Sequence, residues 1–389
     1  MDRIYMDNAA TTATDPKVLA EMEPYFTEFY GNPSSFHSFG REAREAVKEA
    51  RTKVADLIGA DKDEEIVFTS GGTESDNHAI KGTANRLADE GDHIITSAVE
   101  HHAVLHTCEY LEKNGFDVTY LPVDEDGLVD PADVKEAITD ETILITIMLA
   151  NNEVGTIQPI AEIGEIAKEN DITFHTDAVQ GVGTIPIDVN ELNVDLLSLS
   201  GHKFHSPKGI GALYIRGGTQ IEKYLHGGAQ EEGRRATTEN VAGIVGLGKA
   251  AEIAQDELAE KGKKLTQLRD KLIDNIMSEI DEIKLNGHRT QRLPNNINFS
   301  IRYIEGESIL MKLDLAGIAA SSGSACTSGS LEASHVLLAM GLSAEVAHGS
   351  LRLSLSKYTT EEEIDKVIEV LPEVVSDLRA MSPIYNQEW

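Results

Sequence analysis

Short apolar and β-branched runs alternate with longer amphipathic stretches through the first 240 residues of the chain. The short runs predict strands, and the stretches between them predict helices, most of them followed by Gly or Asn as a C-terminal cap. This alternation indicates an α/β fold in which a mostly parallel sheet is covered by helices on both faces. The predicted strands lie at residues 64–70, 92–100, 117–124, 142–149, 172–178, 194–203 and 211–217, and the predicted helices at 75–91, 102–115, 131–138 and 160–170.

The pattern changes after about residue 240. We predict a long helix at 241–280, which crosses a boundary between two domains. Beyond it the pattern predicts strands at 295–301 and 351–356 and helices at 306–317, 334–341 and 360–379. We place a large domain at 15–258 and a smaller α+β domain at 1–14 and 259–389.

Composition narrows the possible partners and compartments. Asp and Glu outnumber Lys and Arg by 66 to 34, and the formal net charge of −32 disfavours binding to nucleic acid and to anionic membranes. No apolar run approaches the roughly 18 residues that a membrane-spanning helix needs. The N-terminal residues also lack the basic and apolar regions of a secretory signal. We therefore expect a cytoplasmic protein, and interpret its acidity as a solvated surface adapted to a salty cytoplasm.

Polar clusters follow several predicted strands, which is where ligands bind in open parallel sheets. SGGTESDN at 70–77 places Gly72 and Thr73 at the start of a helix. That arrangement favours a phosphate, although taken alone it is more typical of a tight turn with a helix cap. HTDAVQG at 175–181 places Asp177 after an apolar strand. Such a carboxylate either pairs with a cation, for example a protonated ring nitrogen, or caps the next turn.

A third cluster, SLSGHKFHSPKG at 198–209, places Ser200, His202 and Lys203 directly after a strand. A partly desolvated lysine has a lowered pKa and forms Schiff bases with carbonyl cofactors. An exposed loop lysine is the commoner explanation when the position is considered alone.

The two cysteines occur in different settings, and they are too few for a disulfide framework or a structural zinc site. Cys326 lies among small polar residues at 321–330, which predicts a mobile, exposed loop presenting a reactive thiol. Cys108 lies within a predicted helix, where a packed structural role is expected. His102 and His106 share a face of that helix, but without a nearby acidic ligand no metal site is predicted.

Further short motifs accompany these clusters. The series reads DNAATT at 7–12, GNPSSFH at 31–37, FTSGGTESDN at 68–77, EHHAV at 100–104, NNEVG at 151–155, HTDAVQ at 175–180, SGHK at 200–203 and SSGSACTS at 321–328. In this order the motifs resemble the NifS/IscS cysteine desulfurases, which belong to aminotransferase class V and to the fold type I enzymes that use pyridoxal 5′-phosphate (PLP). The resemblance extends from residue 4 to about residue 380. It implies a homodimeric enzyme with PLP as cofactor and L-cysteine as substrate.

The resemblance also implies a role for each matching residue. Lys203 would bind PLP and act as the base, Asp177 would pair with the pyridine nitrogen, and His101 would stack on the ring. Cys326 would accept the sulfur as a persulfide, leaving L-alanine. The other implied contacts are Gly72, Thr73, Ser200 and His202 with the phosphate, Asn152 and Gln180 with the O3′ side of the ring, Thr238 with the phosphate of a neighbouring subunit, and Asn152 and Arg352 with the substrate.

The sequence departs from the family pattern between residues 226 and 240. Ala229, Glu232 and Thr237 stand where the family usually has Gly, Arg and Gly, which makes the contact across the dimer less certain. His205 also replaces a common aromatic residue just after the lysine. None of these changes affects the groups that make or break bonds.

An iron–sulfur scaffold protein is the implied sulfur acceptor, with proteins of tRNA thiolation as the alternative. Two other functions stay open. One is a selenocysteine lyase or another class V PLP enzyme, such as an aminotransferase, although transamination has no need for the Cys326 thiol. The other is a non-catalytic sulfur carrier or scaffold, against which the combination of Lys203, Asp177 and His101 argues.

Overall fold

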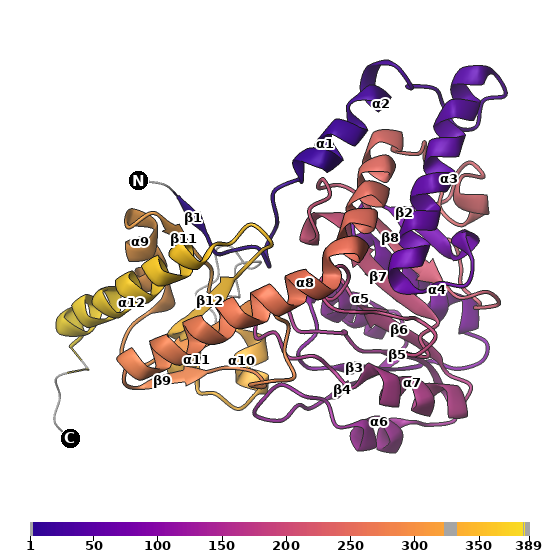
Figure 1. The fold of residues 1–389 in the computed structure, drawn as a ribbon. Coiled ribbons are helices and arrows are strands. Elements are labelled where there is room, and N and C mark those ends of the chain that lie inside the picture. Colours follow the sequence, from indigo (N-terminus) through magenta and orange to yellow (C-terminus); the bar gives the residue numbers. More distant parts are fainter. Residues whose placement is uncertain (1–2, 323–332, 384, 386–389) are drawn as a thin grey trace.

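The computed structural model describes residues 3–322, 333–383 and 385. Its largest sheet has seven strands in the order β2-β8-β7-β6-β5-β3-β4 (Figure 1). Strand β8 is antiparallel to both of its neighbours and the other pairs are parallel, so the predicted mostly parallel sheet is confirmed. The strands are β2 (Ile66–Thr69), β3 (His93–Ser97), β4 (Asp117–Leu121), β5 (Thr142–Thr146), β6 (Thr173–Asp177), β7 (Leu196–Ser200) and β8 (Gly211–Ile215).

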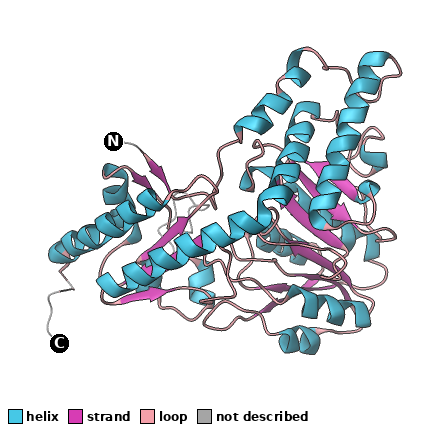
Figure 2. Cartoon of the chain, in the orientation of Figure 1, coloured by secondary structure: helices cyan, strands magenta, loops and turns pink. Residues whose placement is uncertain are grey.

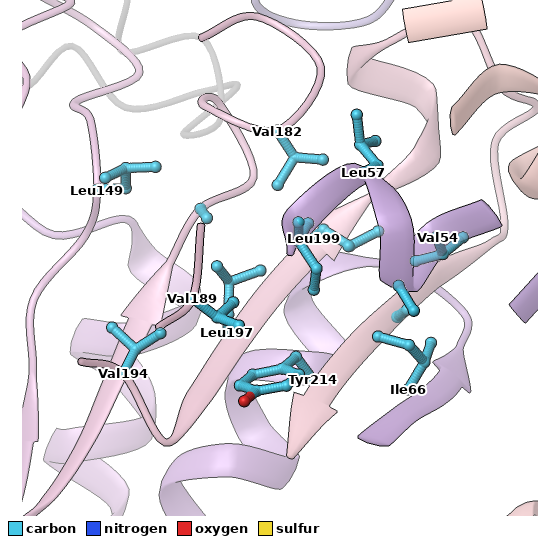
Figure 3. Packing of buried hydrophobic residues seen from close by; sticks show 14 of the residues in the cluster. Val54, Leu57, Ile66, Leu149, Val182, Val189, Val194, Leu197, Leu199 and Tyr214 are labelled. Carbon is cyan, nitrogen blue, oxygen red and sulfur yellow. The ribbon is translucent and has the colours of Figure 1, made fainter. Parts of the chain in front are cut away.

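Helices cover both faces of this sheet (Figures 1 and 2). Along β2, Ile66 and Phe68 belong to one buried cluster and Val67 to another, because successive side chains point to opposite faces. Figure 3 shows part of the first cluster, to which Leu57 of α3 and Leu199 and Tyr214 of the sheet all belong. The helices on that face are α3 (Ser38–Ile58), α6 (Pro131–Ala137) and α7 (Ile160–Glu169), and those on the other are α4 (Gly72–Leu87) and α5 (His102–Glu112).

Three helices near the N-terminus were not predicted: α1 (Pro16–Met22), α2 (Pro24–Thr27) and α3. Helix α3 nevertheless carries a readable signal, because Val47, Ala50 and Val54 recur at three- and four-residue spacing and are all buried. Short 3₁₀ turns lie farther along the chain at η1 (Asp63–Glu65), η2 (Gly201–Lys203) and η3 (Glu231–Gly233).

Helix α8 (Val241–Glu279) contributes to two separate hydrophobic cores. Ile244 and Leu247, near its start, pack in the core beneath the large sheet, whereas Leu268 and Leu272 pack in a second core. Figure 1 shows the helix running from one group of elements to the other. The predicted boundary between residues 258 and 259 falls inside this helix, and the division into domains stays a prediction.

The second core lies around a three-stranded antiparallel sheet in the order β12-β10-β9 and a two-stranded parallel pair, β1 and β11. Ile4 and Met6 belong to this core, so the N-terminal strand packs with elements more than 250 residues later. The elements are β1 (Ile4–Tyr5), β9 (Ile283–Leu285), β10 (Asn296–Ile301), β11 (Ile318–Ala319), β12 (Ser350–Ser354), α9 (Gly306–Leu315), α10 (His335–Ala339), α11 (Ala344–His348) and α12 (Glu361–Met381).

The chain between β1 and α1 runs along the edge where the site residues emerge. Thr12 N–H donates to the carbonyl of His202 (3.0 Å), and Asp15 N–H donates to that of His205 (3.0 Å). None of the helices in the described ranges combines the length and the apolar character needed to cross a membrane.

Candidate active site

Lys203 lies in the turn η2, directly after β7. Its Nζ donates hydrogen bonds to the carbonyl oxygens of Ala9 (2.6 Å) and Ala10 (3.0 Å). The side chain is therefore held at the carboxyl edge of the sheet by the segment that crosses from β1 to α1. This is the strand-end position that the sequence predicts for Lys203, and its environment is more specific than that of an exposed loop lysine.

Asp177 ends β6, the neighbour of β7, and is 5% exposed. Its Oδ1 accepts a hydrogen bond from Val179 N–H (2.9 Å), so the alternative of a turn cap is correct for one oxygen. The other oxygen, Oδ2, has no hydrogen bond to any described residue and is available to a ligand. Burial raises the pKa of Asp177 to about 6, against the lowering effect of the Val179 N–H and the Lys203 charge.

His101 is the N-cap of α5, and its Nδ1 accepts a hydrogen bond from Ala103 N–H (3.1 Å). Burial, followed by the nearby charge of Lys203, lowers the pKa of His101 to about 4. The ring is thus neutral at pH 7, with its proton on Nε2 because Nδ1 is an acceptor. A neutral, half-buried imidazole near Lys203 is suited to lie against a flat ring.

A cavity of about 390 Å³ opens at the N-terminal end of α4. The N-cap of this helix is Gly71, which has no side chain to cap the helix. The N–H groups of the first turn of α4 are therefore not occupied by an N-cap side chain and can bind an anion. A Cβ added at Gly72 would lie 2.6 Å from Val179 Cγ2, so only glycine fits beside the turn that Asp177 caps. The cavity is lined by the predicted Gly72, Thr73, Ser200 and His202, and also by Thr11, Ser70, Gly71, Glu74, Lys208 and Gly209.

His202 is oriented by Thr11, whose hydroxyl lies 3.1 Å from the ring Nδ1. Burial, followed by the charges of Lys203 and Lys208, lowers the pKa of His202 to about 4, so the ring is neutral at pH 7. Lys208 lies in the same SGHKFHSPKG segment as Lys203 and was missed by the sequence analysis, although its place directly before Gly209 was visible.

Arg352, on β12, is brought to the same edge of the large sheet from the second core. It is 3% exposed, and it donates from Nη1 to the carbonyl oxygen of Asn152 (2.9 Å) and from Nη2 to Asp7 Oδ1 (3.0 Å). Its Nε is buried and has no hydrogen bond partner among the described residues. Gln180 donates from Nε2 to Ala9 O (3.1 Å), the carbonyl that Lys203 also contacts.

The sequence analysis did not foresee the acidic groups buried behind this edge. Burial raises the pKa of Glu100 to about 8, even though Ser97 and Met148 donate hydrogen bonds to its Oε1. Burial, with the charge of Asp177 second, raises the pKa of Asp76 well above its usual range. Burial thus favours the neutral form of both groups, and with a pKa of about 8 Glu100 is mostly protonated at pH 7.

Among the described residues, the predicted Thr238 does not line this cavity. Thr238 is exposed and lines a second cavity of about 220 Å³, which meets the first at Ser70 and Gly209. Cys326 lies outside the described residues. Cys108 is fully buried, and burial raises the pKa of its thiol far above the usual value.

Within the described ranges, no group of three His, Cys, Asp or Glu residues is arranged to hold a metal ion. His102 and His106 are neighbours, with ring centroids 4.9 Å apart, but form no such group.

Comparisons with known proteins agree with this geometry. Residues 4–367 match the aminotransferase class-V family. The cysteine desulfurase IscS of Methanosarcina thermophila is 60% identical over 386 residues, covering 99% of this chain and 95% of the relative. A solved structure described as a NifS-like protein has a TM-score of 0.91 at 42% identity, over 97% of this chain and 100% of that one. Another, described as SspA in complex with cysteine, has a TM-score of 0.82 at 41% identity, over 92% and 100%.

These matches span nearly the whole chain and confirm the resemblance seen in the motifs. The chain therefore belongs to the aminotransferase class-V family, within its NifS/IscS type of cysteine desulfurase.

Proposed function

We propose that this protein is a PLP-dependent cysteine desulfurase that converts L-cysteine to L-alanine and transfers the sulfur to Cys326 as a persulfide. The observation that carries the proposal is the placement of Lys203 beside the buried Asp177 carboxylate and the anion cavity of α4. The three features match the aldehyde, the ring nitrogen and the phosphate of one cofactor.

The donor set fits PLP. Asp177 Oδ2 is available within a buried site, and such a carboxylate stabilises a protonated ring nitrogen. Gly72, Thr73, Ser200 and His202 would hold the phosphate, and Asn152 and Gln180 would lie on the O3′ side of the ring. PLP supplies a covalent anchor for the amino acid and an electron sink that makes its Cα–H and C–S bonds easier to break.

The chain's own residues would bind and orient the substrate and move its protons. Arg352 suits an α-carboxylate, because its guanidinium is buried, already donates to the carboxylate of Asp7 and has an Nε–H that no described residue accepts. Lys203 would take the α-proton, since a lysine amine at this edge acts as a base once it is neutral. His101 would keep the ring in place without adding charge.

The sulfur would then pass to Cys326. The Cys326 thiolate would attack the substrate sulfur, forming a sulfur–sulfur bond as the carbon–sulfur bond breaks. A proton replaces sulfur on that carbon, which gives L-alanine. The persulfide would be delivered to an acceptor protein, for iron–sulfur cluster assembly or tRNA thiolation. We further propose a cytoplasmic homodimer, in which Thr238 contacts the phosphate of the neighbouring subunit.

Incubation with L-cysteine tests this function. We expect the wild-type protein to release alanine and to carry a protein-bound persulfide, and we expect Cys326→Ser to lose the persulfide. The Lys203→Ala variant should lose both products together with the yellow absorbance of the bound cofactor. Cys108→Ser is the matched control, because the Cys108 thiol is buried and should not react. Pyruvate and ammonia in place of alanine would exclude a desulfurase, and a normal persulfide in Cys326→Ser would exclude Cys326 as the acceptor.

A further inference from the structure

A carboxylate lies at the anion end of α4, where it would be expected to oppose phosphate binding. Glu74 lies in the first turn of this helix and lines the 390 Å³ cavity together with Gly72 and Thr73. A negative charge at this position is attracted to the same N-terminal N–H groups that attract a phosphate. Unless it is neutralised, Glu74 therefore competes with the ligand and repels it.

Arg235 occupies both oxygens of Glu74. Arg235 Nε donates to Oε1 (2.7 Å) and Nη2 to Oε2 (3.0 Å), which is a bidentate pair with side chains only 15% and 11% exposed. Ser70 N–H also donates to Oε2 (2.7 Å). Although burial raises the pKa of Glu74, these bonds from Arg235 and Ser70 lower it below its usual value, so the carboxylate is ionised and fully occupied.

Arg235 does not itself line the phosphate cavity. It lines the neighbouring 220 Å³ cavity, in the segment between β8 and α8 that also carries Thr238. Within one subunit, Arg235 reaches the phosphate cavity through Glu74, which lines that cavity.

We propose that Arg235 is a positioning residue for phosphate binding, which acts by holding Glu74 in place and neutralising its charge at the N-terminal end of α4. This inference rests on the proposed function, because the phosphate is that of PLP. It makes Glu74 and Arg235 a unit: the carboxylate orders Ser70 at the cavity wall, and the guanidinium removes the electrostatic cost of having that carboxylate there.

The chain offers a matched control in Arg51 and Glu231. This pair is also bidentate (2.7 and 3.0 Å), with side chains 15% and 2% exposed, and it fastens the same segment between β8 and α8. Neither residue lines the phosphate cavity. The loss of Arg51 therefore shows how loosening of this segment affects PLP binding while Glu74, beside the phosphate cavity, stays paired with Arg235.

The test compares the dissociation constants of PLP and of pyridoxal, which has the same ring and aldehyde but no phosphate, for apoprotein prepared from the full chain. We expect Arg235→Gln to weaken PLP binding by about tenfold at low salt and to leave pyridoxal binding unchanged. The Arg235→Gln/Glu74→Gln double variant should regain most of the PLP affinity. Glu74→Gln alone should bind PLP at least as tightly as wild type, and Arg51→Gln should keep the wild-type ratio of the two constants.

A purely structural role predicts that the double variant binds no better than Arg235→Gln, or that PLP and pyridoxal are weakened equally; either result overturns the inference. If Arg235→Gln does not fold, Glu74→Gln and Arg235→Lys still decide the matter. Weaker PLP binding in Glu74→Gln would overturn the inference. In Arg235→Lys, PLP binding that is weaker than in wild type while pyridoxal binding is unchanged supports the inference, and equal weakening of both overturns it. A wild-type protein that binds PLP no more tightly than pyridoxal would overturn the proposed phosphate site itself, and with it this inference.

Discussion

Asp177 illustrates at the residue scale how a binding function opposes stability. The carboxyl lies in a buried position at the end of β6, with one oxygen left without a protein partner. Burial of an ionised carboxylate is unfavourable, and for this reason its pKa is raised to about 6. A ligand that brings a positive charge to this carboxylate recovers the lost free energy, which links the cost of burying Asp177 to affinity for a cationic group.

Asp177→Asn should therefore stabilise the apoprotein at neutral pH. Because the pKa of Asp177 is higher in the folded chain than the usual value near 3.9, its favourable contribution is complete below about pH 4 and is lost as the pH rises through about 6. The free energy of unfolding of the variant, relative to wild type, should rise between these pH values by up to about 3 kcal/mol and then level off. Urea unfolding of the two apoproteins at several pH values measures this difference.

The exposed Asp140 provides the control for that measurement. Asp140→Asn removes an exposed carboxylate and gives the baseline for such a replacement under the same conditions. A difference in unfolding free energy for Asp177→Asn that stays flat with pH would mean that the Asp177 carboxyl ionises without an energetic cost in the folded chain. The same variant should bind PLP more weakly, since an amide cannot balance the charge of the ring nitrogen.

At the scale of elements, helix α8 uses glycine in two different ways. Near its start it packs closely against α3, and a Cβ added at Gly248 would lie 2.6 Å from Ala50 Cα. Farther along the same helix, a Cβ at Gly262 would meet no atom within 4 Å. The first glycine permits a close approach of two backbones, whereas the second only lowers the helix propensity.

Alanine substitutions at these two positions should have opposite effects on stability. Gly248→Ala forces α3 and α8 apart and should lower the free energy of unfolding by about 1–3 kcal/mol. Gly262→Ala should raise it by about 0.5–1 kcal/mol, because alanine restricts the unfolded chain and favours the helix. Chemical denaturation of both variants measures the effects. Stabilisation by Gly248→Ala would show that the α3–α8 contact adjusts without strain.

At the scale of the whole molecule, two cores are joined by α8 and the site lies where elements of both meet. Arg352 comes from the second core and Lys203 from the large sheet, and each contacts the segment between β1 and α1, at Asp7 and at Ala9. The surface of this assembly is strongly acidic, with a formal net charge of −32. Repulsion between like charges opposes the compact state, and salt screens it.

The protein should accordingly become more stable as salt is added. We expect the thermal midpoint to rise by a few degrees between about 0.05 and 1 M KCl, because the screening length shortens from more than 10 Å to about 3 Å. Screening of the surface ion pairs acts in the opposite direction, but 66 acidic residues against 34 basic ones make repulsion the larger effect. Differential scanning calorimetry measures the shift. If sucrose at the same osmolality raised the thermal midpoint by the same amount, the cause would be exclusion of solute from the protein surface and not screening of charge repulsion.

Much of the fold and part of the site could be predicted from sequence because the signals are local. Strands and helices of the large sheet follow from residue periodicity, and Lys203 and Asp177 follow from their positions directly after strands. Helix α3 was missed even though its buried residues recur at helical spacing. The cavity proposed to hold the phosphate was readable for the same reason as Lys203, since glycines after a strand and before a helix are contiguous in the chain.

The sequence by itself therefore determined the order of the elements, the family, and the residues at the ends of parallel strands. The tertiary structure decided which distant residues meet: Arg352 with Asp7, 345 residues apart, and Arg235 with Glu74, 161 apart. It also decided the charge states of Asp177, Glu100 and Asp76, because these depend on burial. Periodicity reports the face on which a side chain lies, but the solvent access and partners of that side chain depend on the packing of segments that no local pattern brings together.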